Sequence, residues 1–283
     1  MFAGKTCRSI IFSSLVALSA CAIPATNPPS LNAEEVGGER TTQARLVAEH
    51  NLKLEKERAT EMLDFQKRLM MVGSEIAGSG TEVCLEMNQA NKDNSCVYSF
   101  EIYGADEEKA KKVGINAFAD GKKIYVTKPM MRFASKDDEL ALVLAHEYSH
   151  NIMGHISSQK QNMVLGAIAG ALIDGLAASR GYNTQGDFTK IGAEAATLSY
   201  SKAFETEADY VGMYILARAG RNYKSAPELW RKLSLKQPDA IYISTTHPSN
   251  PERFVLMEKV VQEINQKKKL KEPLLPNLKP KET

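Results

Sequence analysis

Along residues 39–77, apolar side chains recur at helical spacing among Glu, Lys and Arg. This periodicity predicts one long amphipathic helix with a solvated charged face. The pattern then changes to short β-prone runs that are separated by turn residues. We expect a small β region within residues 82–127, with strand-like stretches at 82–87, 95–103, 115–119 and 123–127.

Beyond the β region the apolar periodicity is again helical, and a capping pattern at residues 135–138 marks the start of the first of these helices. The expected helices run from 137 to about 157, from about 187 to 219, from about 225, and from 251 to about 267. The sequence therefore predicts an α+β fold: a mainly helical domain with a small β-sheet ahead of the helix that begins at residue 137.

Residues 163–178 are apolar and rich in glycine. A helix that spans a membrane needs about 20 such residues, whereas this stretch contains Asp174 and ends just before Arg180. We expect a buried helix or a mobile lid here. A segment that dips into a membrane is the alternative.

The N-terminus has the layout of a signal peptide, with Lys5 and Arg8 ahead of a short apolar run. The run ends in Leu-Ser-Ala-Cys at residues 18–21, which resembles a bacterial lipobox. We expect residues 1–20 to be removed and Cys21 to be lipidated, with plain secretion as the alternative. Ala22 after the cysteine resembles Gram-negative signals for the outer membrane.

The remaining boundaries follow from composition. Residues 21–38 are expected to form the lipid attachment site and a flexible tether, residues 39–267 a single domain, and residues 268–283 a disordered tail rich in Lys and Pro. The chain has 36 basic and 34 acidic residues, and Lys5 and Arg8 account for the difference. A neutral mature protein with a periplasmic address is not a basic nucleic-acid binder.

Cys84 and Cys96 remain once Cys7 and Cys21 have been assigned to the signal and the lipid. Both lie in strand-like stretches with a turn-rich segment between them, so a β-hairpin would bring them together. We expect a disulfide in an oxidising compartment, with two free thiols as the alternative.

His146, Glu147 and His150 form an HExxH pattern inside the helix that begins at residue 137. Positions i and i+4 share one helical face, so the two histidines can hold one zinc ion with Glu147 beside it. The flanking residues are apolar, and burying these polar groups without a partner would cost free energy. Satisfied core histidines without a metal are the alternative.

The third ligand is expected from a later helix, where Glu205 and Asp209 lie on one face. Glu205 would bind zinc, and Asp209 would accept a hydrogen bond from a ligand imidazole. His155 is expected near the site or on the surface rather than as a ligand, and Glu207 is expected in solvent.

Together with residues 116–127, His247-Pro248 and Arg253, these motifs resemble the gluzincin metallopeptidases of the HtpX and CaaX-prenyl-protease family. A lipidated form without spanning helices resembles its periplasmic outer-membrane branch, of the LoiP type. The resemblance implies a zincin-type domain with one zinc per chain. Lys202 stands where that family usually has arginine.

By the resemblance, His247 would stabilise the oxyanion or occupy the fourth position of zinc, with Arg253 assisting it. Glu147 would act as the general base on a water at that position. The strand at Asn116 and Ala117 would pair with an extended substrate.

We therefore expect an endopeptidase that degrades unfolded or misassembled envelope proteins at the periplasmic face of the outer membrane, with outer-membrane assembly machinery as a possible partner. The alternative is a zinc-binding periplasmic chaperone or assembly factor with little proteolysis.

Overall fold

The computed structural model describes residues 33–87, 96–104, 113–197, 202–236, 247 and 251–278. The chain divides into two compact units, Met1–Lys56 and Glu57–Thr283. Helix α1 (Ala33–Glu86) begins in the first unit, where its described side chains are almost all exposed. Residues 33–38 are thus helical, whereas the sequence predicted a flexible tether there. The expected signal peptide and Cys21 lie outside the described residues.

Helix α1 continues past the predicted end at residue 77 because its later turns enter the core of the second unit. Ile76, Val83 and Cys84 are fully buried on one side of the helix. Gly80 leaves room for the ring of Tyr148, since a Cβ there would lie 2.5 Å from it. The predicted strand at 82–87 is therefore wrong: most of this segment is helix.

The disulfide between Cys84 and Cys96 is present. Because Cys84 is helical, this bond joins α1 to the residues just before strand β1, and the predicted hairpin between the two cysteines is wrong.

A mixed three-stranded sheet follows: β1 (Ser99–Tyr103), β2 (Ala117–Ala119) and β3 (Lys123–Thr127). Strand β3 is central, parallel to β1 and antiparallel to β2. The predicted hairpin around Asp120 is confirmed. Its turn is attached to the helical core by a 2.9 Å hydrogen bond from the Gly121 amide to the side chain of Asn151.

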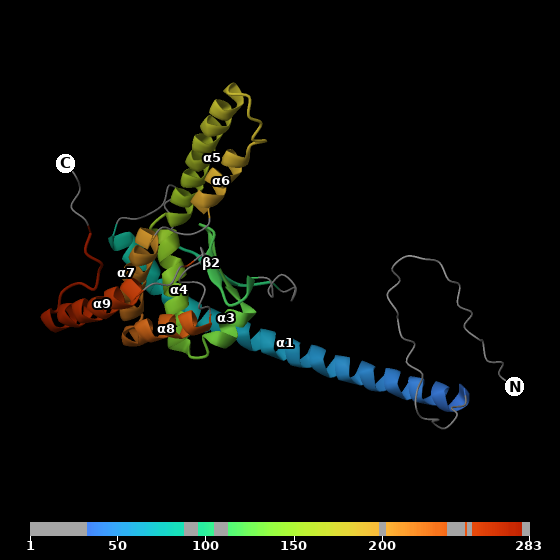
Figure 1. The fold of residues 1–283 in the computed structure, drawn as a ribbon. Coiled ribbons are helices and arrows are strands. Elements are labelled where there is room, and N and C mark those ends of the chain that lie inside the picture. Colours follow the sequence, from blue (N-terminus) through green and yellow to red (C-terminus); the bar gives the residue numbers. More distant parts are fainter. Residues whose placement is uncertain are drawn as a thin grey trace. The chain divides into compact units, whose positions relative to one another are not determined.

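The short helix α3 (Lys128–Phe133) leads into α4 (Asp137–Ile152), and every residue of α4 from Leu140 onward is buried. Helix α4 packs against α7 (Lys202–Arg218), the 3₁₀ turn η1 (Tyr223–Ser225) and α8 (Ala226–Lys236), and α9 (Pro251–Leu270) packs against α7 and α8 (Figure 1). The predicted mainly helical α+β class is confirmed.

Two further boundaries differ from the prediction. Helix α4 ends at Ile152 rather than near 157, because Gly154 adopts φ +69°, a left-handed conformation that breaks the helix. Residues 268–278 are not wholly a disordered tail: α9 continues to Leu270, and Lys267 donates a 2.6 Å hydrogen bond to the carbonyl of Leu275.

Residues 163–178 lie within α5 (His155–Ser179), which runs beside α6 (Asp187–Thr197) (Figure 1). The prediction of a buried helix is wrong here, because only His155, Ile156 and Gly170 of α5 are buried. Among the described residues, α5 is the one helix that is long and apolar enough to cross a membrane.

Candidate metal centre

Helix α4 presents two imidazoles on one buried face. His146 and His150 are one helical turn apart and exposed by only 1% and 0%. Their Nε2 atoms lie 3.1 Å from each other. Glu147, 2% exposed, stands one residue further round the same helix.

Helix α7 crosses α4 closely enough to bring a carboxylate to these imidazoles. Gly212 permits the approach, because a Cβ there would lie only 3.2 Å from the backbone of Ala145 and His146. Glu205 is fully buried, and its carboxylate oxygens lie 3.4 Å from His146 Nε2 and 3.4 Å from His150 Nε2.

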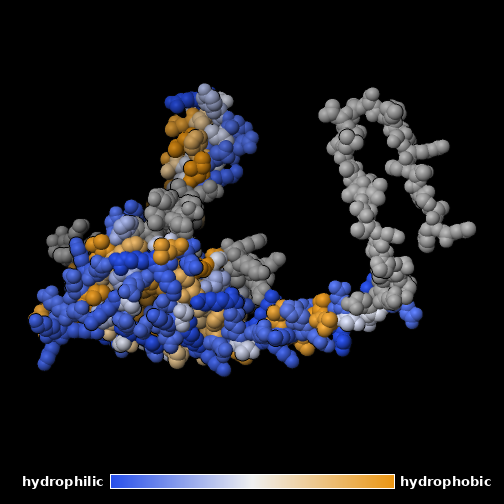
Figure 2. All heavy atoms as spheres, turned by 60° about the horizontal axis from the view of Figure 1, so that its bottom comes forward, coloured by the Kyte–Doolittle hydropathy of each residue, from blue (hydrophilic) through white to orange (hydrophobic). Residues whose placement is uncertain are grey.

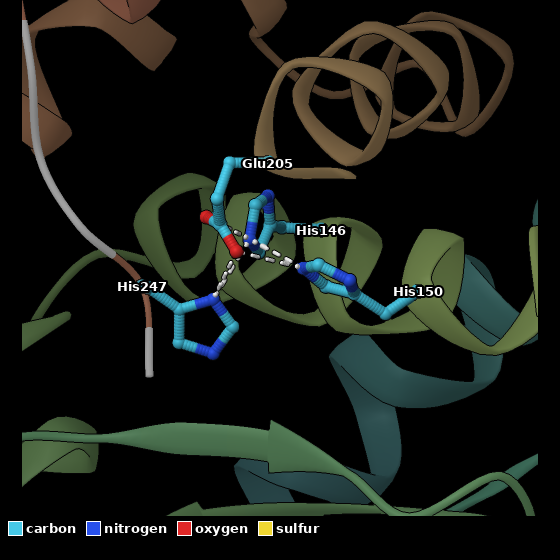
Figure 3. Close-up of side chains that lie close together, drawn as sticks. All are labelled: His146, His150, Glu205 and His247. Atoms are coloured by element: carbon cyan, nitrogen blue, oxygen red, sulfur yellow. Dashed lines mark hydrogen bonds and ion pairs between the residues drawn. The ribbon is translucent and has the colours of Figure 1, made fainter. Parts of the chain in front are cut away.

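His247 completes the cluster from a distant part of the chain (Figure 3). Its Nδ1 atom lies 3.0 Å from Glu205 Oε1 and 3.4 Å from His146 Nε2. One ligand atom each from His146, His150, Glu205 and His247 falls within 4.8 Å of the others, a grouping that can hold one metal ion.

The donor set fits zinc. With metal–ligand bonds of about 2.0–2.1 Å, the edge of a tetrahedral site is about 3.3 Å long. The shorter separations, 3.0 to 3.4 Å, match this edge, within a cluster whose ligand atoms all lie within 4.8 Å of one another. Charge agrees as well: Glu147, Glu205 and Asp209 are buried with one guanidinium, Arg253. With neutral imidazoles the sum is 1 − 3 = −2, which a divalent cation neutralises.

A second layer fixes the ligands. His146 Nδ1 lies 3.0 Å from Asp209 Oδ1, which favours the tautomer with Nε2 free for a metal. Arg253 donates to both oxygens of Asp209, at 2.6 and 2.8 Å, and its Nη1 lies 2.9 Å from Glu205. The guanidinium also stacks 4.8 Å from the ring of Trp230.

His150 has its own support, through His155. The Nδ1 atoms of the two rings are 2.9 Å apart, and His155 Nε2 lies 2.8 Å from Glu207 Oε2. If Glu207 accepts from Nε2–H, then His155 Nδ1 accepts from His150 Nδ1–H, leaving His150 Nε2 free for a metal. His155 is therefore beside the site, as one alternative predicted, but Glu207 is not simply solvated.

Burial and neighbouring charges shift the pKa values of the clustered groups in opposite directions. Burial lowers the pKa of His146, but Asp209 and Glu205 outweigh burial and raise it to about 9. The pKa of His247 is also raised, since Glu147 and Glu205 outweigh burial. Burial lowers the pKa of His150. Burial would raise the pKa of Glu205, but His247 and Arg253 hold it well below its ordinary value.

Peptidase family M48 matches residues 82–261 of the sequence, which include all of these groups. The chain belongs to family M48. This membership confirms the predicted metallopeptidase class and its zinc cofactor.

Relatives within M48 come from mitochondria and from bacteria. The mitochondrial metalloendopeptidase OMA1 of Schizosaccharomyces pombe is 28% identical over 54% of this chain and 45% of its own length. OMA1 of Arabidopsis thaliana is 31% identical, over 50% of the chain and 29% of its length. The β-barrel assembly-enhancing protease of Yersinia pestis is 30% identical, over 42% and 26%. The chain thus spans less than half the length of these relatives.

The M48 site unites residues that the sequence analysis singled out separately. His146, His150, Glu205 and His247 converge, and Glu147, Asp209 and Arg253 contact that cluster. Arg253 was expected to assist His247; the contacts above place it on Asp209 and Glu205. Glu207 was expected in solvent but contacts His155, and no sequence pattern indicated Trp230. A lone tryptophan has no motif, and the partner of Glu207 lies 52 residues away.

Proposed function

We propose that this M48 peptidase is a zinc-dependent endopeptidase that cleaves unfolded or misassembled envelope proteins. The observation that supports this most is Glu147, a buried carboxylate beside the ligand cluster. Its Oε1 lies 3.3 Å from His247 Nε2, and its Oε2 has no hydrogen-bond partner among the described residues. A protein that only bound zinc would bear the cost of burying this group without using it.

Zinc, when bound, polarises the substrate carbonyl and lowers the pKa of water. Glu147 is the general base: Oε2 accepts a proton from the attacking water and returns it to the departing amine. Asp209 and His155 hold His146 and His150 in the tautomers that leave Nε2 free for zinc. Arg253 orients Asp209 and Glu205, and together with His247 it keeps the pKa of Glu205 well below its ordinary value.

The substrate is an extended peptide that adds to the outer edge of β2. Asn116 is paired with Thr127, since its carbonyl accepts from the Thr127 amide at 3.0 Å. Hydrogen-bonding direction alternates along an antiparallel strand, so the backbone groups of Ala117 and Ala119 face away from β3. Ala117 and Ala119 therefore provide the main-chain pairing, which selects unfolded segments without reading their side chains.

His247 restrains this activity. Its Nδ1 lies among the metal ligands, which supports the alternative in which it occupies the fourth position of zinc. With His247 among the residues that would hold zinc, a substrate would have to displace this side chain from the cluster, which would protect the resting enzyme from indiscriminate cleavage.

The envelope location rests on two supports. The sequence has the signal and lipobox pattern ending at Cys21, and several relatives are named β-barrel assembly-enhancing proteases. Together these favour a lipid-anchored protein of the Gram-negative envelope, in the outer-membrane lipoprotein branch that resembles HtpX, with envelope proteins as substrates and the assembly machinery as a partner.

The deciding experiment compares wild type with Glu147→Gln, and with Glu228→Gln as an exposed control. Bound zinc and casein cleavage are measured on the full chain. We expect about one zinc in each protein and a loss of at least about 100-fold in cleavage for Glu147→Gln alone. Wild type that keeps zinc and never cleaves casein would favour a zinc-binding chaperone.

The same assay tests the restraint by His247. His247→Ala should keep zinc, because His146, His150 and Glu205 remain. It should cleave casein several-fold faster than wild type. Slower cleavage with full zinc content would contradict the restraint and favour the oxyanion role.

A further inference from the structure

The hairpin of α5 and α6 has its large apolar side chains on the outside. Large apolar side chains of α5 point away from α6 into solvent, with exposures of 47–67%. We call this set the apolar face of α5: Val164, Leu165, Ile168, Leu172, Ile173 and Leu176. In Figure 2 it forms an orange side of the hairpin, opposite a blue side. Helix pairs in water bury such residues between them.

Glycines fill the seam between the two helices instead. A Cβ on Gly170 would lie 2.0 Å from the carbonyl oxygen of Phe188, and one on Gly192 would lie 2.2 Å from that of Gly166. Gly166 and Gly170 form a small-xxx-small pattern. Backbone contact through small residues, with large apolar residues outside, is how helices associate in lipid.

The hairpin also satisfies the one acidic residue of α5 internally. Asp174 is the one charged residue between Lys160 and Arg180. Its carboxylate accepts hydrogen bonds from the hydroxyl of Thr184 and from the amide and hydroxyl of Thr189, the latter two at 2.9 and 2.7 Å. The charge is thus turned toward the start of α6, which leaves the apolar face of α5 uncharged.

The ends of this face carry groups suited to lipid headgroups. Lys160 precedes it and Arg180 follows it, and both cations complement anionic headgroups. Tyr182, 69% exposed, lies at the tip, where an amphipathic ring favours the membrane–water interface.

Length decides how such a hairpin would meet a bilayer. Helix α5 as a whole, with 25 residues, is long enough to cross a membrane, but its apolar stretch 163–178 is only about 24 Å long. That is shorter than the roughly 30 Å hydrocarbon core, and α6 has only 11 residues. The tip between them is polar. These dimensions fit a hairpin that lies in the interface with one side immersed, rather than one that crosses the membrane.

We propose that the apolar face of α5 docks on the surface of a phospholipid bilayer, as a membrane contact separate from any lipid at Cys21. Docking would hold the peptidase domain at the membrane through the helix that begins at His155, beside the metal centre. This proposal does not depend on catalysis.

The test places a tryptophan in the face. Full-length Leu172→Trp is added to vesicles of phosphatidylethanolamine and phosphatidylglycerol that contain dibrominated phosphatidylcholine. Lys190→Trp, on exposed α6, is the matched control, and the signal of native Trp230 is subtracted using wild type. We expect a blue shift and at least about twofold quenching at position 172, and little change at position 190.

Second variants separate lipid contact from misfolding. Adding Ile168→Glu to Leu172→Trp should abolish the quenching, whereas adding Leu235→Glu, at an exposed leucine of α8, should leave it unchanged. Zinc content and thermal unfolding report whether each variant is folded.

Three results would overturn the proposal. The first is equal quenching at positions 172 and 190, or none at either. The second is a concentration-dependent blue shift without vesicles, together with a dimer mass, which would assign the face to a second copy of the chain. The third is a shift with unfolded casein but not with vesicles, which would assign it to substrate.

Discussion

The pairs α4–α7 and α5–α6 both approach closely at glycine, yet they expose opposite chemistry. In α4–α7, Gly212 lies against Ala145, and the space beside that crossing holds imidazoles and carboxylates sealed from water. In α5–α6, Gly170 and Gly192 bring the backbones together, and large apolar side chains face outward. Close packing alone therefore does not determine what a helix pair is for.

The difference lies in what satisfies each surface. The polar groups of α4–α7 partner one another, in pairs such as Arg253 with Asp209 and His155 with Glu207. The net negative charge of these groups can be balanced by a divalent cation. The hairpin satisfies Asp174 internally and exposes the apolar face of α5. The first pair needs an ion, and the second needs an apolar surrounding.

Among the variants that test this comparison, Glu205→Ala is expected to have the largest effect. It removes a metal ligand and one partner of Arg253, so bound zinc should fall to a small fraction of one per chain. Losing one partner of a buried ion pair costs about 3–5 kcal/mol of unfolding free energy. Elemental analysis and denaturant unfolding measure the two effects.

The hairpin provides an internal reference for that variant. Hydrogen exchange in α6 should remain as in wild type, because Glu205 does not contact the α5–α6 seam in the described part of the chain. Full zinc content in Glu205→Ala would exclude Glu205 as the third ligand.

The next effect is the pH dependence of zinc affinity. His146 carries a proton below its pKa of about 9 in the metal-free protein, and zinc must displace that proton. Affinity should therefore weaken as pH falls from 9, by about tenfold per unit. Competition with a chromophoric chelator measures it. A flat profile below pH 9 would contradict the coupling between His146 and its carboxylates.

His155→Ala should have a smaller effect on the same centre. It leaves all four ligand residues in place but removes the group that orients His150, so zinc affinity should fall about 10–100-fold. His50→Ala, at the exposed histidine of α1, is the matched control. If both variants bind zinc like wild type, the chain from His150 through His155 to Glu207 does not position the ligand.

The smallest effect concerns the hairpin. Gly170→Ala places a methyl group against the Phe188 carbonyl and should separate α6 from α5, at a local cost of about 1–3 kcal/mol. Gly175→Ala meets no atom within 4 Å and should instead favour the helix by up to about 1 kcal/mol. Hydrogen exchange in α6 separates the two variants. Zinc content should be unchanged in both, and equal exchange would refute the glycine seam.

Local patterns predicted the parts of this molecule that depend on neighbouring residues. The ligands of α4 follow from i,i+4 spacing, as do Glu205 and Asp209 on α7, and the β2–β3 hairpin follows from its turn. Contacts between distant segments could not be predicted in this way. Glu207 meets His155 only because α7 passes the start of α5.

Environment explains the other differences. The apolar pattern around Cys84 is too short to distinguish a strand from a helix. Burial of Val83 and Cys84 beside Ile76 extends α1. Residues 163–178 are apolar in any environment, so the sequence alone could not exclude a buried position. Their exposure depends on the glycine seam with α6.

The hairpin enters the chain between His150 and Glu205, the second and third ligands along the sequence. Since α4 and α7 touch directly through Ala145 and Gly212, the two halves of the ligand set meet without it. Apart from His155, which supports His150, the segment is thus an insertion in a centre whose first three ligands come from α4 and α7. In a fold built this way, the segment that attaches the protein to its surroundings can change while the catalytic site stays the same. The attachment can therefore evolve independently of the chemistry.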